Sequence, residues 1–142
     1  MNITMIDDSY AFDGATSSTR AIGGAEKAFA HLATALAARG HDVTAINCCE
    51  YQSSVDGVLW VPFETPRPPE SDVIIAFRKP ELLDEFDDPG ARSILWMWGP
   101  PKALNQPFNQ KSLEKHDPAI VFVGTAQRRA WKSWRDFKEV TI

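Results

Sequence analysis

Short runs of apolar residues alternate with helix-like segments along most of the chain. Runs of five to seven largely apolar residues, bounded by Gly, Pro, Asp or Ser, predict strands. They cover residues 2–6, 42–46, 57–63, 72–77, 93–98 and 119–124, and residues 139–142 begin a further strand. Because polar residues rarely alternate with apolar ones in these runs, we expect strands that are buried on both faces of a sheet.

The clearest helical pattern precedes the second strand and covers Gly24–Arg39. Its apolar positions recur with the helical period on one face: Phe29, Leu32, Ala33 and Leu36. Gly40 follows, where a left-handed cap is expected. Shorter helices are expected over residues 80–86, over residues 112–116, and from Ala126 to about Phe137 with Thr125 as the N-cap.

This alternation predicts an α/β fold in one domain, residues 1–142, with a Rossmann-like open parallel sheet and helices on both faces. In such sheets, ligands bind outside the carboxyl ends of the strands, at the point where the strand order reverses. With the order 3-2-1-4-5-6, the crevice opens between the first and fourth strands. Its rim then comprises the loop after Ile6, the "FRKP" turn, the "WMWGPP" turn and the start of the last helix.

Two adjacent glycines, Gly23 and Gly24, open the long helix after a loop that begins at Asp7. This loop is much longer than the about 2–6 residues usual in α/β units, and long loops tend to be functional. Free N–H groups and the helix dipole favour an anion at such a helix start. The alternative is a flexible loop in which the glycines serve only the turn. A dinucleotide-binding G-x-G-x-x-G and a Walker loop are both absent.

Composition and charge narrow the function classes. The chain is 44% hydrophobic and 24% charged, as expected of a globular protein, and its net charge of −4 argues against nucleic acid as a partner. Cys48 and Cys49 are adjacent, which disfavours a disulfide between them, so we expect a reducing cytoplasmic location. The first residues lack the features of a signal peptide. Asp7, Asp8 and Asp13 are expected to lie in solvent rather than to bind a metal ion.

The segment "GGAEKAFAHLATALAARGHDVTAI" resembles the first helix and second strand of GT-B glycosyltransferases, in the large family of retaining enzymes that use nucleotide sugars. The resemblance rests on Gly-Gly-Ala-Glu at the helix start and on Arg-Gly-His-x-Val at the second strand. It covers about a quarter of the chain. The segments "VGTAQRRAWKSW" and "EVTI" also resemble the family's last N-terminal strand and helix and the strand that leads to its second domain.

The resemblance implies that the chain is the N-terminal, acceptor-side half of a glycosyltransferase, without the C-terminal donor-binding domain, and inactive alone. Gly23 and Gly24 would then contact the diphosphate of the donor, and no metal ion or cofactor is expected. The histidine that many relatives carry after the fifth strand has no counterpart in residues 96–99, so no catalytic residue is predicted. Two other classes remain open: a stand-alone anion- or sugar-binding module, and a non-catalytic interaction domain.

The predicted rim of the crevice supplies the acceptor-side candidates, namely Arg78, Lys79, Trp98, Gly99 and Thr125. The two cations suit an anionic group, and a tryptophan can stack on a sugar; ordinary solvated charge and core packing are the alternatives. The last helix is basic and aromatic. It could contact an anionic membrane surface through Arg128, Arg129, Trp131, Lys132 and Arg135, although packing on the sheet is the favoured interpretation.

Overall fold

All the predicted strands join one sheet in the computed structural model, which describes residues 1–142. The strands are β1 (Asn2–Ile6), β2 (Asp42–Asn47), β3 (Ser53–Val55), β4 (Val58–Pro62), β5 (Val73–Phe77), β6 (Arg92–Met97), β7 (Ala119–Phe122) and β8 (Glu139–Thr141). The eight-stranded sheet has the order β3-β4-β2-β1-β5-β6-β7-β8. Only β3 pairs antiparallel, so the chain is an α/β protein with a mostly parallel sheet in the expected strand order.

The helices connect these strands. They are α1 (Thr16–Thr19), α2 (Gly24–Ala38), α3 (Pro107–His116) and α4 (Thr125–Arg129), with 3₁₀ helices η1 (Pro80–Glu85) and η2 (Pro101–Asn105). The expected helix over residues 80–86 is therefore a 3₁₀ helix, and the one over residues 112–116 begins earlier, with a proline in its first turn. As predicted, Gly40 has a positive φ of 84° after α2.

The prediction of a long last helix is wrong. The helix α4 ends at Arg129, and its N-cap is Gly124 rather than Thr125. The segment that follows is irregular and returns along the sheet, because β8 must run parallel to β7. On this path Trp131 packs against Phe122, with ring centroids 5.9 Å apart, and against Phe137 at 5.8 Å. The segment after Arg129 is thus stabilised by packing of these rings rather than by helical hydrogen bonds.

The hairpin of β3 and β4 was not predicted, although the sequence carries a signal for it. Asp56 and Gly57 connect the two strands and both have positive φ, 51° and 79°. Asp-Gly is a preferred pair in two-residue hairpin turns, which require this conformation. The hairpin covers one edge of the sheet with a short antiparallel strand.

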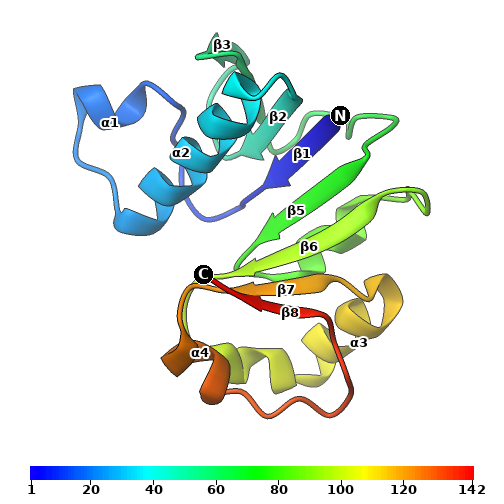
Figure 1. Cartoon of the computed structure of the whole chain (residues 1–142). Helices are drawn as coiled ribbons and strands as arrows, with labels where there is room; N and C mark the ends of the chain where they lie inside the picture. The colour runs from blue at the N-terminus through cyan, green and yellow to red at the C-terminus, as the bar shows by residue number, and fades with distance from the viewer.

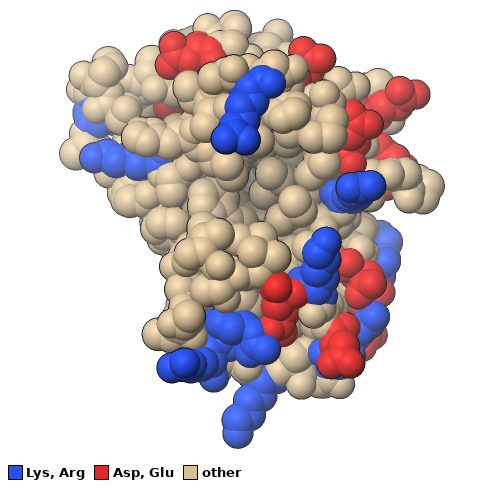
Figure 2. Space-filling view, viewed as in Figure 1, with Lys and Arg blue, Asp and Glu red and all other residues tan.

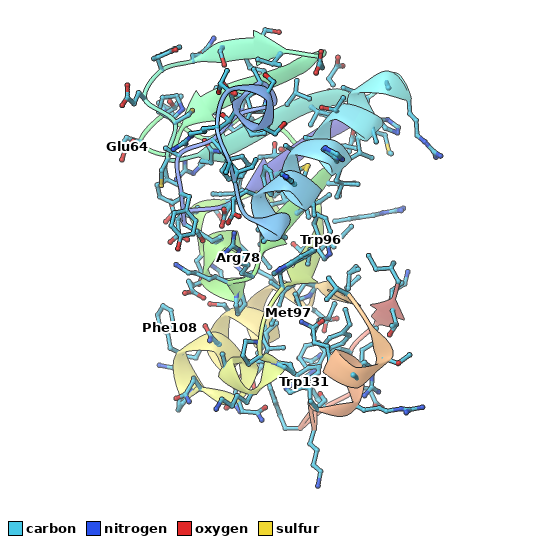
Figure 3. All side chains as sticks on the ribbon, turned by 90° about the vertical axis from the view of Figure 1, so that its left-hand side faces the viewer. Glu64, Arg78, Trp96, Met97, Phe108 and Trp131 are labelled. Atoms are coloured by element: carbon cyan, nitrogen blue, oxygen red, sulfur yellow. The ribbon has the colours of Figure 1, made fainter.

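Helices lie on both faces of the sheet (Figure 1). Two apolar clusters lie on opposite faces beneath them. One combines α2 with the side chains of Met5, Ala45, Trp60 and Phe77. The other lies beneath η1, η2, α3 and Trp131. Alternate residues of β6 serve the two clusters, as the strand period requires: Trp96 belongs to the first cluster and Met97 to the second (Figure 3). Helices therefore cover both faces, and the carboxyl ends of β1 and β5 meet near the start of α2.

Candidate functional site

The carboxyl ends of β1 and β5 meet where the strand order reverses, and charged side chains gather there. Asp7 follows β1 and is fully buried, which corrects the expectation of a solvated loop aspartate. Its Oδ1 accepts a hydrogen bond of 2.9 Å from Ser9. Its Oδ2 has no hydrogen-bond partner and lies 3.7 Å from Nη2 of Arg78. Burial raises the pKa of Asp7, although the hydrogen bond from Ser9 and the Arg78 charge oppose the shift.

Arg78 follows β5 and is central to this group (Figure 3). Its φ of 71° is in the left-handed region, which a non-glycine residue rarely adopts. The backbone N–H of Arg78 donates to the carbonyl of Trp96 at 2.9 Å, and its guanidinium lies 4.8 Å from the centre of the Phe77 ring. Nη2 donates to Oε1 of Glu26 at 2.6 Å. The unusual backbone thus presents the guanidinium to the start of α2.

Glu26 closes the start of α2 and explains one of the two glycines. It is the third residue of the helix and only 7% exposed. A Cβ on Gly23 would collide with Oε2 of Glu26, so any other residue there would displace this carboxylate from its position over the helix start. Burial raises the pKa of Glu26, but the hydrogen bond from Arg78, a backbone hydrogen bond and the Arg78 charge together hold the pKa below the usual value.

Gly24 is in a different environment. A Cβ on this residue would meet no atom within 4 Å, so neither packing nor backbone conformation requires a glycine. The backbone there is open to a group arriving from solvent. An anion at this helix end would share it with the Glu26 carboxylate, which already lies close to the positive end of the helix dipole.

A second ion pair lies beside the first. Nζ of Lys79 contacts Oδ1 of Asp8 at 2.8 Å, and the hydrogen bond to this carboxylate raises the pKa of Lys79. The Cys48 thiol donates to the carbonyl of Asp8 at 3.3 Å. Burial raises the pKa of both Cys48 and Cys49, so these thiols stay protonated at neutral pH. Both predicted cations, Arg78 and Lys79, are therefore already paired within the chain.

The remaining acceptor-side candidates lie after β6 and β7. Trp98 is half-buried, with its ring 6.0 Å from that of Trp96 and 6.1 Å from that of Phe77. Gly99 has a φ of 123°, and its carbonyl accepts a hydrogen bond of 2.7 Å from Nε2 of Gln127. Thr125 is exposed at the start of α4. The Phe77 ring thus packs against both Trp98 and Arg78, whereas Gly99 is hydrogen-bonded to Gln127 of α4.

The basic segment near the C-terminus is largely engaged with the protein itself. Trp131 is only 3% exposed, Arg128 pairs with Glu139, and Arg135 pairs with Asp117 at 3.0 Å. Lys and Arg side chains gather over this part of the molecule in Figure 2. A membrane contact there stays a prediction, and it would depend on Arg129 and Lys132. None of the helices combines the length and apolar character that crossing a bilayer requires.

Two features of the site were not predicted from the sequence. Glu26 belongs to the Gly-Gly-Ala-Glu sequence but was assigned no function. Its position three residues after the N-cap could have indicated that its carboxylate folds back over the helix start. Two cavities beside the loop between β1 and α2 are lined by Tyr10, Arg20 and Tyr51, among others. No local pattern connects these residues. No group of three or more His, Cys, Asp or Glu side chains is arranged to hold a metal ion.

The comparisons with known proteins add no further assignment. No protein-family model matches the chain, and neither the curated proteins nor the solved structures gave a significant match. The class that the fold and the site define is therefore a mostly parallel α/β protein with a charged cluster at the reversal of its strand order.

Proposed function

We propose that the chain is the Rossmann-like, N-terminal half of a GT-B glycosyltransferase that transfers a sugar from a nucleotide-sugar donor. One observation carries this proposal: the Gly23–Gly24 helix start lies at the carboxyl end of β1, with Arg78, which follows the neighbouring β5, directed toward it. This is the edge at which open α/β sheets bind ligands. The Gly-Gly-Ala-Glu sequence at the same place supports the same interpretation.

In this proposal the donor diphosphate approaches the backbone N–H groups at Gly24, where a Cβ would meet no atom within 4 Å. The dipole and free donors of a helix start contribute about 1–2 kcal/mol, which alone corresponds to millimolar binding or weaker. Tight donor binding and turnover then require a second domain. The acceptor would lie near Trp98, Gly99 and Thr125, and a cytoplasmic location remains part of the proposal.

The experiment measures diphosphate binding to the Gly24→Val variant. We expect UDP, GDP or inorganic pyrophosphate to shift the Gly24 amide resonance of the wild-type chain weakly, and we expect this shift to be lost in the variant. The added side chain would block the backbone while meeting no atom of the protein. Its effect on the melting temperature should be small, since glycine and valine differ by only about 0.5 kcal/mol in helix propensity.

The matched control is Ala35→Val, which introduces the same β-branched residue at an exposed position of α2. It should cost about 0.5 kcal/mol at most, from the lower helix propensity of valine, and leave diphosphate binding intact. Equal diphosphate binding by Gly24→Val and wild type would mean that the glycines serve only the turn. In that case a module that binds through another surface, or an interaction domain without a donor site, would be the better interpretation.

A further inference from the structure

Two cavities flank the loop between β1 and α2 and share three lining residues, namely Ala11, Phe12 and Arg20. One has a volume of about 370 Å³ and extends to Tyr10, Gly23 and Glu26. The other has a volume of about 300 Å³ and extends to Asp13, Glu50 and Tyr51. Both volumes are within the range of small-molecule sites, about 300–1,000 Å³. Because they share these residues, we take the two cavities together as one groove along the Ala11–Phe12 segment.

The segment at the centre of the groove is held in place by the core. The Phe12 ring is 3% exposed and packs edge-on against Phe29 and Trp60, with centroids 5.5 and 5.8 Å away. Nδ2 of Asn47 donates to the carbonyl of Phe12 at 2.5 Å. The Arg20 guanidinium donates to the carbonyl of Ala11. The floor of the groove is thus formed before any ligand arrives, which limits the entropy lost on binding.

The charges along the groove disfavour an anion. Asp13, Glu26 and Glu50 contribute carboxylates, whereas Arg20 contributes one guanidinium that already donates to a backbone carbonyl. Arg78, which contacts the lining residue Glu26, is paired with that carboxylate. A ligand that brings hydroxyl donors suits these carboxylate oxygens better than a phosphate does.

Each of the two cavities is lined by one exposed tyrosine, Tyr10 in the larger and Tyr51 in the smaller. Tyr10 is 63% exposed and Tyr51 is 72% exposed, and they are the two tyrosines of the chain. Neither phenol is part of the core. Exposed rings next to carboxylate acceptors can contact both the C–H face and the hydroxyl groups of a sugar, since a phenol combines an apolar body with a polar tip.

We propose that this groove binds a neutral sugar chain of about two residues, from Tyr10 and Glu26 at one end to Tyr51 and Glu50 at the other. The assignment rests on the proposed function in one respect: in a glycosyltransferase this sugar chain would be the acceptor, and the groove would take the place of the Trp98, Gly99 and Thr125 side as the acceptor site. Its end beside Glu26 and Gly23 lies nearest to the proposed diphosphate site, so the reacting hydroxyl belongs to that end.

The experiment titrates the ¹⁵N-labelled chain with neutral mono- and disaccharides of glucose, galactose, mannose and N-acetylglucosamine. At least one disaccharide is expected to shift the amide resonances of Ala11, Asp13 and Tyr51 to saturation. Tyr10→Ala and Tyr51→Ala are each expected to weaken that binding about fivefold to tenfold, as for loss of a stacked ring. Because both side chains are exposed, the melting temperature should stay close to that of the wild type.

Phe108→Ala is the matched control, because this ring is 64% exposed on α3, on the other half of the molecule (Figure 3). It should leave sugar binding unchanged. Inorganic phosphate and spermidine are titrated in parallel. The proposal is overturned if no saccharide shifts these amides, or if only phosphate or spermidine does. Diphosphate binding at Gly24 is measured separately, so a failure of the donor site and a failure of the groove give different results.

Discussion

At the residue scale, the structure gives different roles to the two neighbouring glycines. Gly23 leaves room for the Glu26 carboxylate, whereas a side chain at Gly24 would enter open space. Glu26 in turn binds Arg78, whose positive φ directs its side chain to the helix start. The protein therefore places its own carboxylate close to the position proposed for the donor phosphate. An anionic ligand must compete with that carboxylate.

This competition predicts that Glu26→Gln increases diphosphate affinity. Removing the negative charge of Glu26 near the helix N-terminus should strengthen diphosphate binding by about 0.3–1 kcal/mol, which is about twofold to fivefold in affinity. The Arg78 guanidinium would also become available to the ligand. The same variant should be less stable by about 1–3 kcal/mol, because a buried charged hydrogen bond is weakened. Pyrophosphate titration and thermal melting measure the two effects.

Glu70→Gln supplies the control for overall charge. Glu70 is exposed and precedes β5, so it lies at the amino-terminal ends of the strands. The same change in net charge therefore occurs away from the start of α2. An affinity gain that is no larger in Glu26→Gln than in Glu70→Gln would contradict the idea that Glu26 competes with the ligand.

At the scale of elements, one carboxylate joins η1 to α3. Asp84 accepts hydrogen bonds from Ser112 at 2.5 Å, from His116 at 2.8 Å and from Lys115 at 3.3 Å. Ser112 is buried and bonds the carboxylate rather than the imidazole, so the group is a link between helices and not a Ser-His-Asp catalytic triad. Burial raises the pKa of Asp84, but the three hydrogen bonds outweigh it and hold the pKa below the usual value.

We therefore expect Asp84→Asn to lower the free energy of unfolding by about 1–2 kcal/mol at neutral pH, a range reduced for the partial exposure of the carboxylate. A lowered folded-state pKa gives stability that is present above the unfolded pKa, about 4, and is lost as the pH falls through the folded pKa. The difference between wild type and variant should thus disappear in acid. Urea unfolding from neutral pH downward measures it.

The control for this pH dependence is Asp87→Asn. Asp87 is an exposed acid close to η1 that has no hydrogen-bond partner in the structure. Its stability difference from the wild type should be small at every pH. A difference for Asp84→Asn that persists in acid would show that the loss comes from packing rather than from the carboxylate charge.

At the scale of the whole molecule, a single sheet separates two apolar clusters. Phe29 and Trp60 are buried on one face, and Phe122 and Trp131 on the other. Each cluster takes side chains from the same strands β1, β5 and β6. Loss of the strands would expose both clusters at once, so we expect the two faces to unfold together.

We therefore predict a single unfolding transition, with the same midpoint whichever face of the sheet the spectroscopic probe lies on. Trp60→Phe and Trp131→Phe each remove one buried tryptophan and should destabilise the protein by about 1–3 kcal/mol. In each variant, the denaturant midpoint from tryptophan fluorescence should equal that from far-ultraviolet circular dichroism. Midpoints that separate in either variant would show that the two faces unfold independently.

Local sequence patterns were sufficient to predict the strands and the principal helix. The apolar runs from residues 2–6 to 119–124 became strands with ends shifted by one or two residues, and α2 occupies nearly the predicted range. These predictions succeeded because a strand or helix buried on the sheet must repeat apolar residues with its own period. The same reasoning failed after Arg129, where three aromatic residues at helical spacing pack instead along an irregular path.

The sequence by itself determined the α/β class and the glycine-containing start of α2, because each is encoded within a few consecutive residues or in the alternation of elements. Only the tertiary structure decided that Asp7 is buried, that Arg78 binds a carboxylate 52 residues away, and that both tyrosines border one groove. Such contacts join residues from separate loops, and their positions follow from how the strands pair. A local pattern carries no information about which distant side chain completes a charge pair or a cavity.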